Sequence, residues 1–569
     1  MTEYFQGKRW AITGRLTEIS RKEATAQLKA KGASVTGGVT SQTDFLVSGG
    51  FDPNRTQYLS SKEKGARQFG IPIFNEPQLL AILAGEETQL VDKLAPAKDE
   101  VATVGTRDAL EGFRELVADE VDDGNWQRIC ELVDRCSARD LPVVLPYLES
   151  FLSQDNSRTV AWWSNTESPR YHRLDIAEPR KLPGNWVFEL LGGANHPKFA
   201  LARAADLRGQ KIRSSIADNL LACEHLGALR ALDLTNNAPS NKFWAAAAAK
   251  PEFAQLRYLA VGNSKLNAAT TKALAKAPFS ATLQALRLEG TQLSGNNAAA
   301  ALFDRGAFER LHTLDVSGVR SPAGALHDAV HRATHLTQLR HLGWNDVEGS
   351  EWGLGHIVAA EQFSTLTHIR YTNRGLGPRS LAALANATHL DNVTRLTVFD
   401  TGWNAAEPGI EQVLEATQFG TVEELIVSVD PAGLSALMHA GHLTSLSHLH
   451  ISGLRDRNED WELLLTAPHL QSVKDLYLGA LLPEGFVGRL LDSDALPNLS
   501  RLHISGTSLV DSDLYAAANA THRALTEFGA HADSGASKAA LQAALDAEHL
   551  PEGGLKSSLH WALDQLQRP

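Results

Sequence analysis

One pattern recurs along the C-terminal two-thirds of the chain and limits what the chain can fold into. From residue 202 onward the template L-x-x-L-x-L-x-x-(N/T/S)-x-L returns at intervals of 24–29 residues. Clear copies begin at Leu229, Leu256 and Leu283. A unit this short cannot bury its own apolar face, so neighbouring copies must stack into one continuous core. The L-x-L segment predicts a short strand, and an alanine-rich stretch such as 242–249 or 268–276 predicts a helix in each repeat.

This pattern resembles the ribonuclease-inhibitor-like leucine-rich repeats. The resemblance implies an α/β fold in which a parallel sheet lines a concave face and helices form a wider outer rim. We therefore expect a curved solenoid over residues 186–536, with two helical stretches in 537–569 capping the last repeat. At the position usually held by Asn, Asn237, Ser264 and Thr291 are expected to hydrogen-bond the turn backbone.

The residue between the last two apolar positions of each strand is expected to point into the concavity. From these positions we predict a partner-binding surface at Arg287, Arg370, His450, Tyr477 and His503. The alternative is that His448, His450 and His503 bind a metal or perform acid–base chemistry. No recurring carboxylate accompanies these histidines and no Ser or Cys nucleophile motif is present, so we predict no catalytic residues, no metal and no cofactor.

The first 90 residues follow a different pattern. Apolar runs at 10–12, 33–35, 43–47 and 71–74 predict strands, and 21–31, 61–69 and 76–83 predict helices. Such alternation favours a small, mostly parallel sheet flanked by helices. The runs F-x-G-K-x-W-x-I-T-G-R-L, T-D-F-L-V-S-G and S-K-x-x-x-A-x-x-x-G-I-P-I, in this order, resemble a BRCT domain. They are most similar to the single BRCT domain of bacterial NAD-dependent DNA ligases.

The BRCT resemblance implies one phosphate site. Its residues would be Thr13 and Gly14 after the first strand and Lys62 at the start of the second helix, with Arg15, Lys64 and Arg67 nearby. A hydroxyl, a backbone N–H and an ammonium near a helix N-terminus suit an anion. The ligand would be a DNA 5′-phosphate or a phosphopeptide. The chain departs from the tandem phosphopeptide readers, because it has a single copy and its final helix lacks the usual tryptophan.

The segment between the two modules carries no predicted site. Residues 91–106 are expected to form a linker, and 107–185 a helical cap region. The three cysteines, Cys130, Cys136 and Cys223, are too few for a disulfide framework and are expected to be reduced thiols. The sequence contains no apolar run of the length that a membrane span needs. We expect a cytoplasmic protein.

The distribution of charge along the chain limits which kinds of partner it can bind. The net charge of −12 argues against a general polyanion binder. Residues 1–90 hold 11 Lys and Arg against 9 Asp and Glu, so any nucleic-acid contact is expected there. We predict a non-enzymatic protein-interaction scaffold, in which the BRCT-like domain and the concave face each bind a partner. The alternative is a DNA-repair factor whose BRCT-like domain binds a DNA 5′-phosphate or nick.

Overall fold

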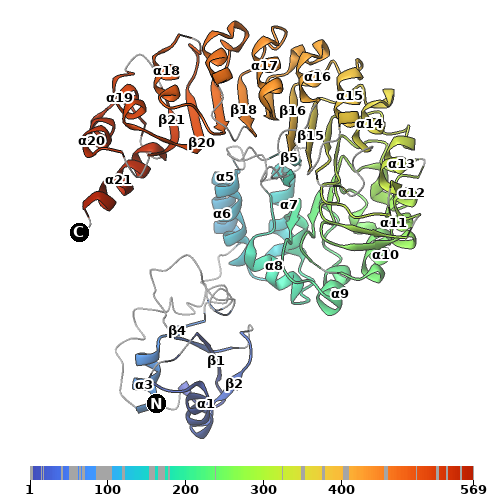
Figure 1. Cartoon of the computed structure of the whole chain (residues 1–569). Coiled ribbons are helices and arrows are strands. Elements are labelled where there is room, and N and C mark those ends of the chain that lie inside the picture. Colours follow the sequence, from blue (N-terminus) through green and yellow to red (C-terminus); the bar gives the residue numbers. More distant parts are fainter. Residues whose placement is uncertain are drawn as a thin grey trace. The chain divides into compact units, whose positions relative to one another are not determined.

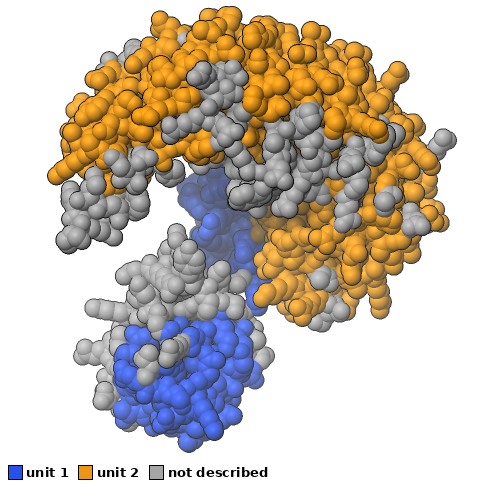
Figure 2. Space-filling model, viewed as in Figure 1, with its two compact units in different colours: residues 1–154, 183–189 blue, residues 155–182, 190–569 orange. Residues whose placement is uncertain are grey.

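The chain divides into two compact units. Unit 1 comprises Met1–Gln154 and Pro183–Glu189, and unit 2 comprises Asp155–Leu182 and Leu190–Pro569 (Figure 2). The computed structural model describes residues 4–49, 62, 66, 71–84, 106–117, 122–152, 161–163, 174–176 and 180–567, except 15, 17, 40–42, 238, 296, 305, 323, 346, 348–352, 374–377, 401–408, 454–458, 495, 521–524, 533–535 and 552–553.

The N-terminal part of unit 1 is a four-stranded parallel sheet in the order β2-β1-β3-β4. Its elements are β1 (Arg9–Gly14), α1 (Arg21–Ala30), β2 (Ser34–Thr36), β3 (Phe45–Gly49), β4 (Ile73–Phe74) and α3 (Glu76–Ala84). These confirm the predicted order of strands and helices. Of the helix predicted at 61–69, the described residues are Lys62 and Ala66, and both are helical. Ser20 caps α1 by accepting a hydrogen bond from the Glu23 amide.

Aromatic side chains form the centre of this domain. The Trp10 side chain is fully buried, and its ring stacks on Phe74 with 5.7 Å between the ring centroids. Its indole N–H donates to the Tyr4 carbonyl at 2.8 Å, so the one polar atom of this buried ring is satisfied. Trp10 therefore anchors β1 in the core of this domain.

The helical segment of unit 1 consists of α5 (Thr106–Leu116), α6 (Asp123–Asp134) and α7 (Leu141–Leu152), as the apolar spacing predicts. Asp122 caps α6 through the Asn125 amide at 2.7 Å. Trp186 in α8 (Gly184–Leu191) donates from its indole to the Asp134 carboxylate at 2.8 Å. Among the described residues the three cysteines are free thiols. Burial raises the pKa of Cys136 and Cys223, so both remain protonated at neutral pH.

Unit 2 contains a 13-stranded sheet whose strands follow one another in chain order and are all parallel. The strands are β7 (Ala204–Asp206), β8 (Ala231–Asp233), β9 (Tyr258–Ala260), β11 (Ala285–Arg287), β13 (Thr313–Asp315), β14 (His341–Gly343), β15 (His368–Asn373), β16 (Arg395–Asp400), β17 (Glu424–Ser428), β18 (His448–Ser452), β19 (Asp475–Gly479), β20 (Arg501–Leu509) and β21 (Glu527–Ala532). Two small sheets pair β5 (Ala161–Trp163) with β6 (Leu174–Ile176) and β10 (Lys265–Asn267) with β12 (Gln292–Ser294).

Helices connect successive strands and lie on the outer side of the arc that the sheet forms (Figure 1). They are α9 (Ser214–Ala222), α10 (Asn241–Ala249), α11 (Ala268–Ala275), α12 (Ala298–Leu302), α13 (Ala325–Arg332), α14 (Gly353–Val358), α15 (Pro378–Asn386), α16 (Ile410–Glu415), α17 (Pro431–His439), α18 (Phe486–Asp492) and α19 (Asp511–Asn519). Two further helices, α20 (Lys538–Asp546) and α21 (Gly554–Gln567), follow the last strand. Between β18 and β19 the connection is the 3-10 helix Glu459–Thr466. The last helix, α21, packs against β21 and α20.

The apolar positions of the template form the core of unit 2. Leu232, Leu259 and Leu286 occupy the same register position on β8, β9 and β11, and each is at most 2% exposed. Burying one leucine side chain stabilises a fold by about 1.5–3 kcal/mol. Hydroxyl side chains also join neighbouring repeats: Thr282 donates to the Leu256 carbonyl at 2.8 Å and Thr365 to the Leu339 carbonyl at 2.8 Å.

Residues with a left-handed backbone recur just after the strands. Gly209, Asn236, Asn263, Gly290 and Gly318 have φ values of 66°, 61°, 58°, 67° and 65°. Each donates its backbone N–H to a carbonyl of the following repeat, for example Asn263 to Glu289 at 2.7 Å. Asn and Gly tolerate this conformation better than other residues do. A Cβ atom on Gly290 would overlap Oδ1 of Asn263, so only glycine fits there.

The expected turn hydrogen bonds are confirmed at two of the three positions. The Asn237 amide donates to the Leu207 carbonyl at 2.8 Å, and the Thr291 hydroxyl donates to the Val261 carbonyl at 3.1 Å. At Ser264 the expectation is wrong, because its buried hydroxyl has no partner among the described residues.

Candidate functional site

The predicted phosphate residues lie at the C-terminal end of β1. Gly14 has φ +72°, and a Cβ atom there would overlap the Gly49 backbone of the neighbouring strand. The Lys62 ammonium donates to the Ile12 carbonyl at 2.9 Å, directly before Thr13. The structure therefore brings Lys62 to the Thr13–Gly14 turn. Thr13 itself is only 8% exposed.

A second cation at this turn was not predicted. The Arg21 guanidinium, from the first residue of α1, donates to the Gly14 carbonyl at 3.0 Å. Burial lowers the pKa of Lys62, and the charge of Arg21 lowers it further. The two cations thus repel each other, and an anion beside Gly14 would relieve that repulsion. Arg15, Lys64 and Arg67 lie outside the described residues.

The inner side of the large sheet carries two rows of side chains that cross the strands. The first row consists of the residues that open each strand, and the second row of the residues two positions later. The second row is Asp206, Asp233, Ala260, Arg287, Asp315, Gly343, Arg370, Thr397, Ile426, His450, Tyr477, His503 and Gly529. The structure thus aligns all the predicted concave residues on one face, in the predicted register.

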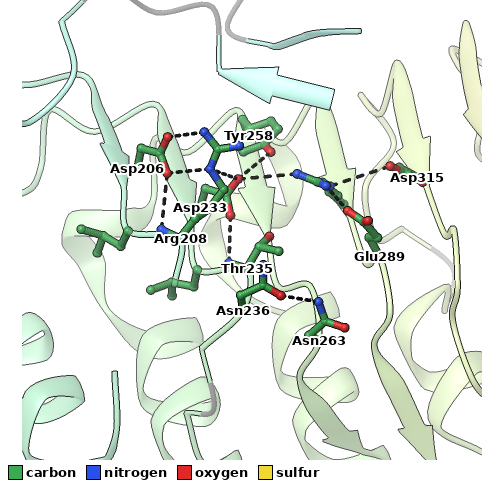
Figure 3. Close-up of polar contacts among 12 residues, drawn as sticks. Asp206, Arg208, Asp233, Thr235, Asn236, Tyr258, Asn263, Glu289 and Asp315 are labelled. Carbon is green, nitrogen blue, oxygen red and sulfur yellow. Dashed lines mark hydrogen bonds and ion pairs between the residues drawn. The ribbon is translucent and has the colours of Figure 1, made fainter. Parts of the chain in front are cut away.

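In the N-terminal half the second row is a buried charge network (Figure 3). Asp233 is fully buried and accepts hydrogen bonds from the Thr235 amide at 2.8 Å and the Tyr258 hydroxyl at 3.2 Å. Arg287 is 3% exposed, pairs with Glu289, and lies 3.9 Å from the Asp233 carboxylate and 3.8 Å from that of Asp315.

Burial raises the pKa of Asp233, although Thr235, Arg287 and Arg208 favour its charged form. Arg208 follows β7, forms a salt bridge with Asp206 at 2.5 Å and lies 3.8 Å from the Asp233 carboxylate. Arginines and carboxylates therefore alternate in this network. The carboxylates around Arg287 come from three different repeats, which ties the repeats together. Arg287 therefore belongs to the internal charge network rather than to an open surface.

Two neutral histidines lie near the middle of the first row. His341 and His368 pack edge to face, with 4.2 Å between the ring centroids. The pKa of His341 is lowered to about 4, mainly by burial and then by the charge of Arg395. The pKa of His368 is lowered to about 3 by burial and by the charges of His341 and Arg395. Burial also lowers the pKa of Arg370, to about 10, so this residue remains cationic at neutral pH. The local potential in this region is positive.

The C-terminal half of the second row is a stack of rings. Tyr477 stacks on His450 at 3.9 Å between centroids and on His503 at 4.6 Å, with interplanar angles of 22° and 15°. Phe399 meets His450 edge on at 5.9 Å. The Tyr477 hydroxyl hydrogen-bonds Ser505 at 2.8 Å. Because both faces of Tyr477 are covered, the stack presents ring edges, which suit polar contacts rather than base or sugar stacking.

Beside the stack, the first row alternates in charge over β16 to β21. Its members are Arg395, Glu424, His448, Asp475, Arg501 and Glu527. Asp475 binds His448 at 2.5 Å on one side and Arg501 at 2.5 Å on the other. The Asp475 carboxylate holds the pKa of Arg501 above its ordinary value. Sequence reasoning placed His448 and Arg501 beside the concave positions but did not predict the ion pairs of this row, because its members share no residue type.

Within the described part of the chain, no group of three or more His, Cys, Asp or Glu residues is arranged to hold a metal ion. Among the helices that the structure describes, none is both long and apolar enough to cross a bilayer.

The comparisons identify the N-terminal domain. Residues 2–83 match the BRCA1 C Terminus (BRCT) domain family, so the chain begins with a BRCT domain. The DNA ligase of Bacillus velezensis (strain DSM 23117 / BGSC 10A6 / LMG 26770 / FZB42) is 41% identical over 80 residues, which are 14% of this chain and 11% of the ligase. The DNA ligase of Roseiflexus sp. (strain RS-1) is 37% identical over 100 residues, 18% of this chain and 13% of the ligase.

The matched region is therefore a small part of both ligases, about a tenth of their length. Among solved structures, an internalin (inlF) from Listeria monocytogenes str. 4b F2365 matches with a TM-score of 0.31 and 14% identity, covering 60% of this chain and 86% of the internalin.

Proposed function

We propose that this chain is a non-enzymatic protein-interaction scaffold in which the BRCT domain and the inner face of a leucine-rich-repeat solenoid each bind a partner. The repeat template, the 13 parallel strands in chain order and the outer helices support the solenoid interpretation. Each strand of this sheet pairs only with the strands of the preceding and following repeats, as expected for a stack of repeats.

The observation that carries the proposal is the ring stack of His450, Tyr477 and His503. These side chains come from three repeats, they line one face, and they include the aromatic types enriched at protein interfaces. We place the partner on this C-terminal half of the inner face, because Tyr477 and His503 are partly exposed there, although His450 is buried, whereas Arg287 in the other half is buried within an ion-pair network. Arg370 stands at the boundary between the two halves.

The test is capture of partners from the source cells by the immobilised full chain, quantified by mass spectrometry. Tyr477→Ala removes the central ring, and Tyr515→Ala is the control, because Tyr515 is 42% exposed on α19 in the outer helix layer. The proposal predicts proteins that wild type and Tyr515→Ala retain and Tyr477→Ala loses. Identical capture by all three proteins would reject the inner face as a binding surface.

A second function is favoured by the BRCT geometry. Two cations, Lys62 and Arg21, meet at the Thr13–Gly14 turn, and the related domains belong to DNA ligases. We propose as the alternative that this turn binds a DNA 5′-phosphate at a nick, which would make the chain a DNA-repair factor.

Fluorescence anisotropy with a nicked duplex, with and without the 5′-phosphate, tests this alternative. Lys62→Ala is expected to weaken binding of the phosphorylated nick about tenfold. It should also reduce the slope of log affinity against log salt concentration by about one. Lys276→Ala, an exposed lysine of unit 2, is the control. Equal affinity for both duplexes, or no effect of Lys62→Ala, would reject the phosphate site.

A further inference from the structure

The inner face over β14, β15 and β16 carries cations and hydroxyls but no carboxylate. Backbone pairing sets the residues of these strands, and the residue before each strand, side by side. The cationic block that results consists of Arg340, His341, Gly343, Thr367, His368, Arg370, Thr394, Arg395 and Thr397. The flanking strands do carry acids, at Asp315 on one side and at Glu423 and Glu424 on the other. Positive charge in the block is therefore not balanced by an acid on the same three strands.

Arg340 carries the least compensated charge of the cationic block. Arg395 forms an ion pair with Glu424 at 3.3 Å, and Asp315 favours the charged form of Arg370. The Arg340 side chain is exposed, and among the described residues its guanidinium makes no hydrogen bond or ion pair. This guanidinium can therefore receive an anion without giving up an existing partner.

Two neutral imidazoles follow Arg340 across the sheet. The Nδ1 atom of His341 lies 3.1 Å from the Thr313 hydroxyl, and that of His368 lies 2.8 Å from the Thr367 hydroxyl. These contacts orient both rings, whereas neither Nε2 atom has a hydrogen-bond partner among the described residues. Each ring therefore has one nitrogen left for a ligand on the inner face.

The charges that act on these two rings are positive. Arg395 lowers the pKa of both imidazoles, and Arg340 and His312 lower that of His341 further, while no described carboxylate raises either. A bound anion would oppose this effect and favour the protonated rings. Each Nε2 could then donate a hydrogen bond to the anion.

We propose that the cationic block binds a phosphate group carried on a side chain of a partner protein, with Arg340 as the main cation. The donors come from β14, β15 and β16, and they span about 10 Å at roughly 4.8 Å per strand. A phosphate monoester carries about two negative charges at neutral pH and has three oxygens that point in different directions, so it can accept hydrogen bonds from several strands. A carboxylate has less charge and two coplanar oxygens, which suit a single guanidinium.

This inference rests on the proposed function of the inner face, and NMR spectroscopy of the full chain tests it. The chain is labelled with ¹³C at the histidine Cε1 atoms, and His341→Gln and His368→Gln assign the two signals. The probes are N-acetyl-O-phosphoserine amide, inorganic phosphate and N-acetylglutamate amide, added at neutral pH and constant ionic strength. We expect saturable shifts of both signals, with an apparent Kd at least about fivefold lower for the phosphoserine probe than for the glutamate probe. Tighter binding of the phosphoserine probe than of inorganic phosphate supports a ligand borne by a protein, and the reverse order would reject it.

Variants assign the binding to Arg340. Arg340→Gln should raise the apparent Kd of the phosphoserine probe about fivefold or more, whereas Arg332→Gln, on the outer helix α13, should leave it unchanged. The signal of the exposed His331 should not move. An absence of saturable shifts, equal affinity for the glutamate probe, or an unchanged Kd in Arg340→Gln would overturn the inference. If Tyr477→Ala loses captured partners and the two histidine signals do not respond to phosphate, the proposed function stands and only the phosphate site is rejected.

Discussion

Gly290 provides a quantitative test of how the repeats are joined. Its backbone is left-handed at φ +67°, and an added Cβ would overlap Oδ1 of Asn263. The Asn263 side chain is held in place because its amide donates a hydrogen bond to Asn236 at 2.6 Å. An alanine at position 290 would therefore displace Asn263 and break that hydrogen bond. Placing alanine in the left-handed region costs about 1–2 kcal/mol. Losing the Asn263–Asn236 hydrogen bond adds about 0.5–1.5 kcal/mol. Gly290→Ala should therefore lower the free energy of unfolding by roughly 1.5–3.5 kcal/mol.

Two other glycines separate these contributions. Gly209 has φ +66° but open space around it, so Gly209→Ala should lose only the backbone part, about 1–2 kcal/mol. Gly227 has an ordinary φ and open space, so Gly227→Ala should change stability by less than about 0.5 kcal/mol. Urea unfolding followed by circular dichroism measures all three. Equal losses at Gly290 and Gly209 would refute the role of Asn263, and no loss at Gly209 would refute the backbone argument.

The remaining predictions concern buried charge and pH. Arg287→Met should destabilise unit 2 by about 3–5 kcal/mol, because it removes the arginine between the buried Asp233 and Asp315 carboxylates and leaves Asp233 with Arg208; adding Asp233→Asn should recover part of that loss in urea unfolding, and full additivity of the two losses would contradict the network. His341 and His368 bind protons less readily in the folded chain, so stability should be fully present above about pH 6.5 and fall as the pH is lowered toward about 4. The double variant His341→Gln and His368→Gln should flatten this pH dependence, while the exposed His331→Gln should not; an unchanged slope in the double variant would show that other groups cause the acid sensitivity.

Periodicity made most of the repeat region predictable. A spacing of about 27 residues fixes which leucines share a register, and this also aligns His450, Tyr477 and His503, which the structure shows as one stack. The same reasoning places Arg287 on the inner face. It could not show that Arg287 is buried, because Asp233, Glu289 and Asp315 come from different repeats and only the folded chain brings them together.

At the Thr13–Gly14 turn of the BRCT domain, the sequence likewise predicts one contact and misses another. The motif order predicts that Lys62 lies near Thr13 and Gly14, and its ammonium lies 2.9 Å from the adjacent Ile12 carbonyl. The motif gives no indication of Arg21, since its contact with the Gly14 carbonyl depends on where α1 begins relative to β1.

The proposed function depends on two separate binding sites, one in the BRCT domain and one on the inner face of unit 2. The most direct measurement compares proteins captured by the full-length wild type, by Lys62→Ala and by Tyr477→Ala in one quantitative experiment. The account predicts that each variant loses a different set of captured partners and keeps the other set. Loss of the same set in both variants, or of none in either, would contradict two independent interaction sites.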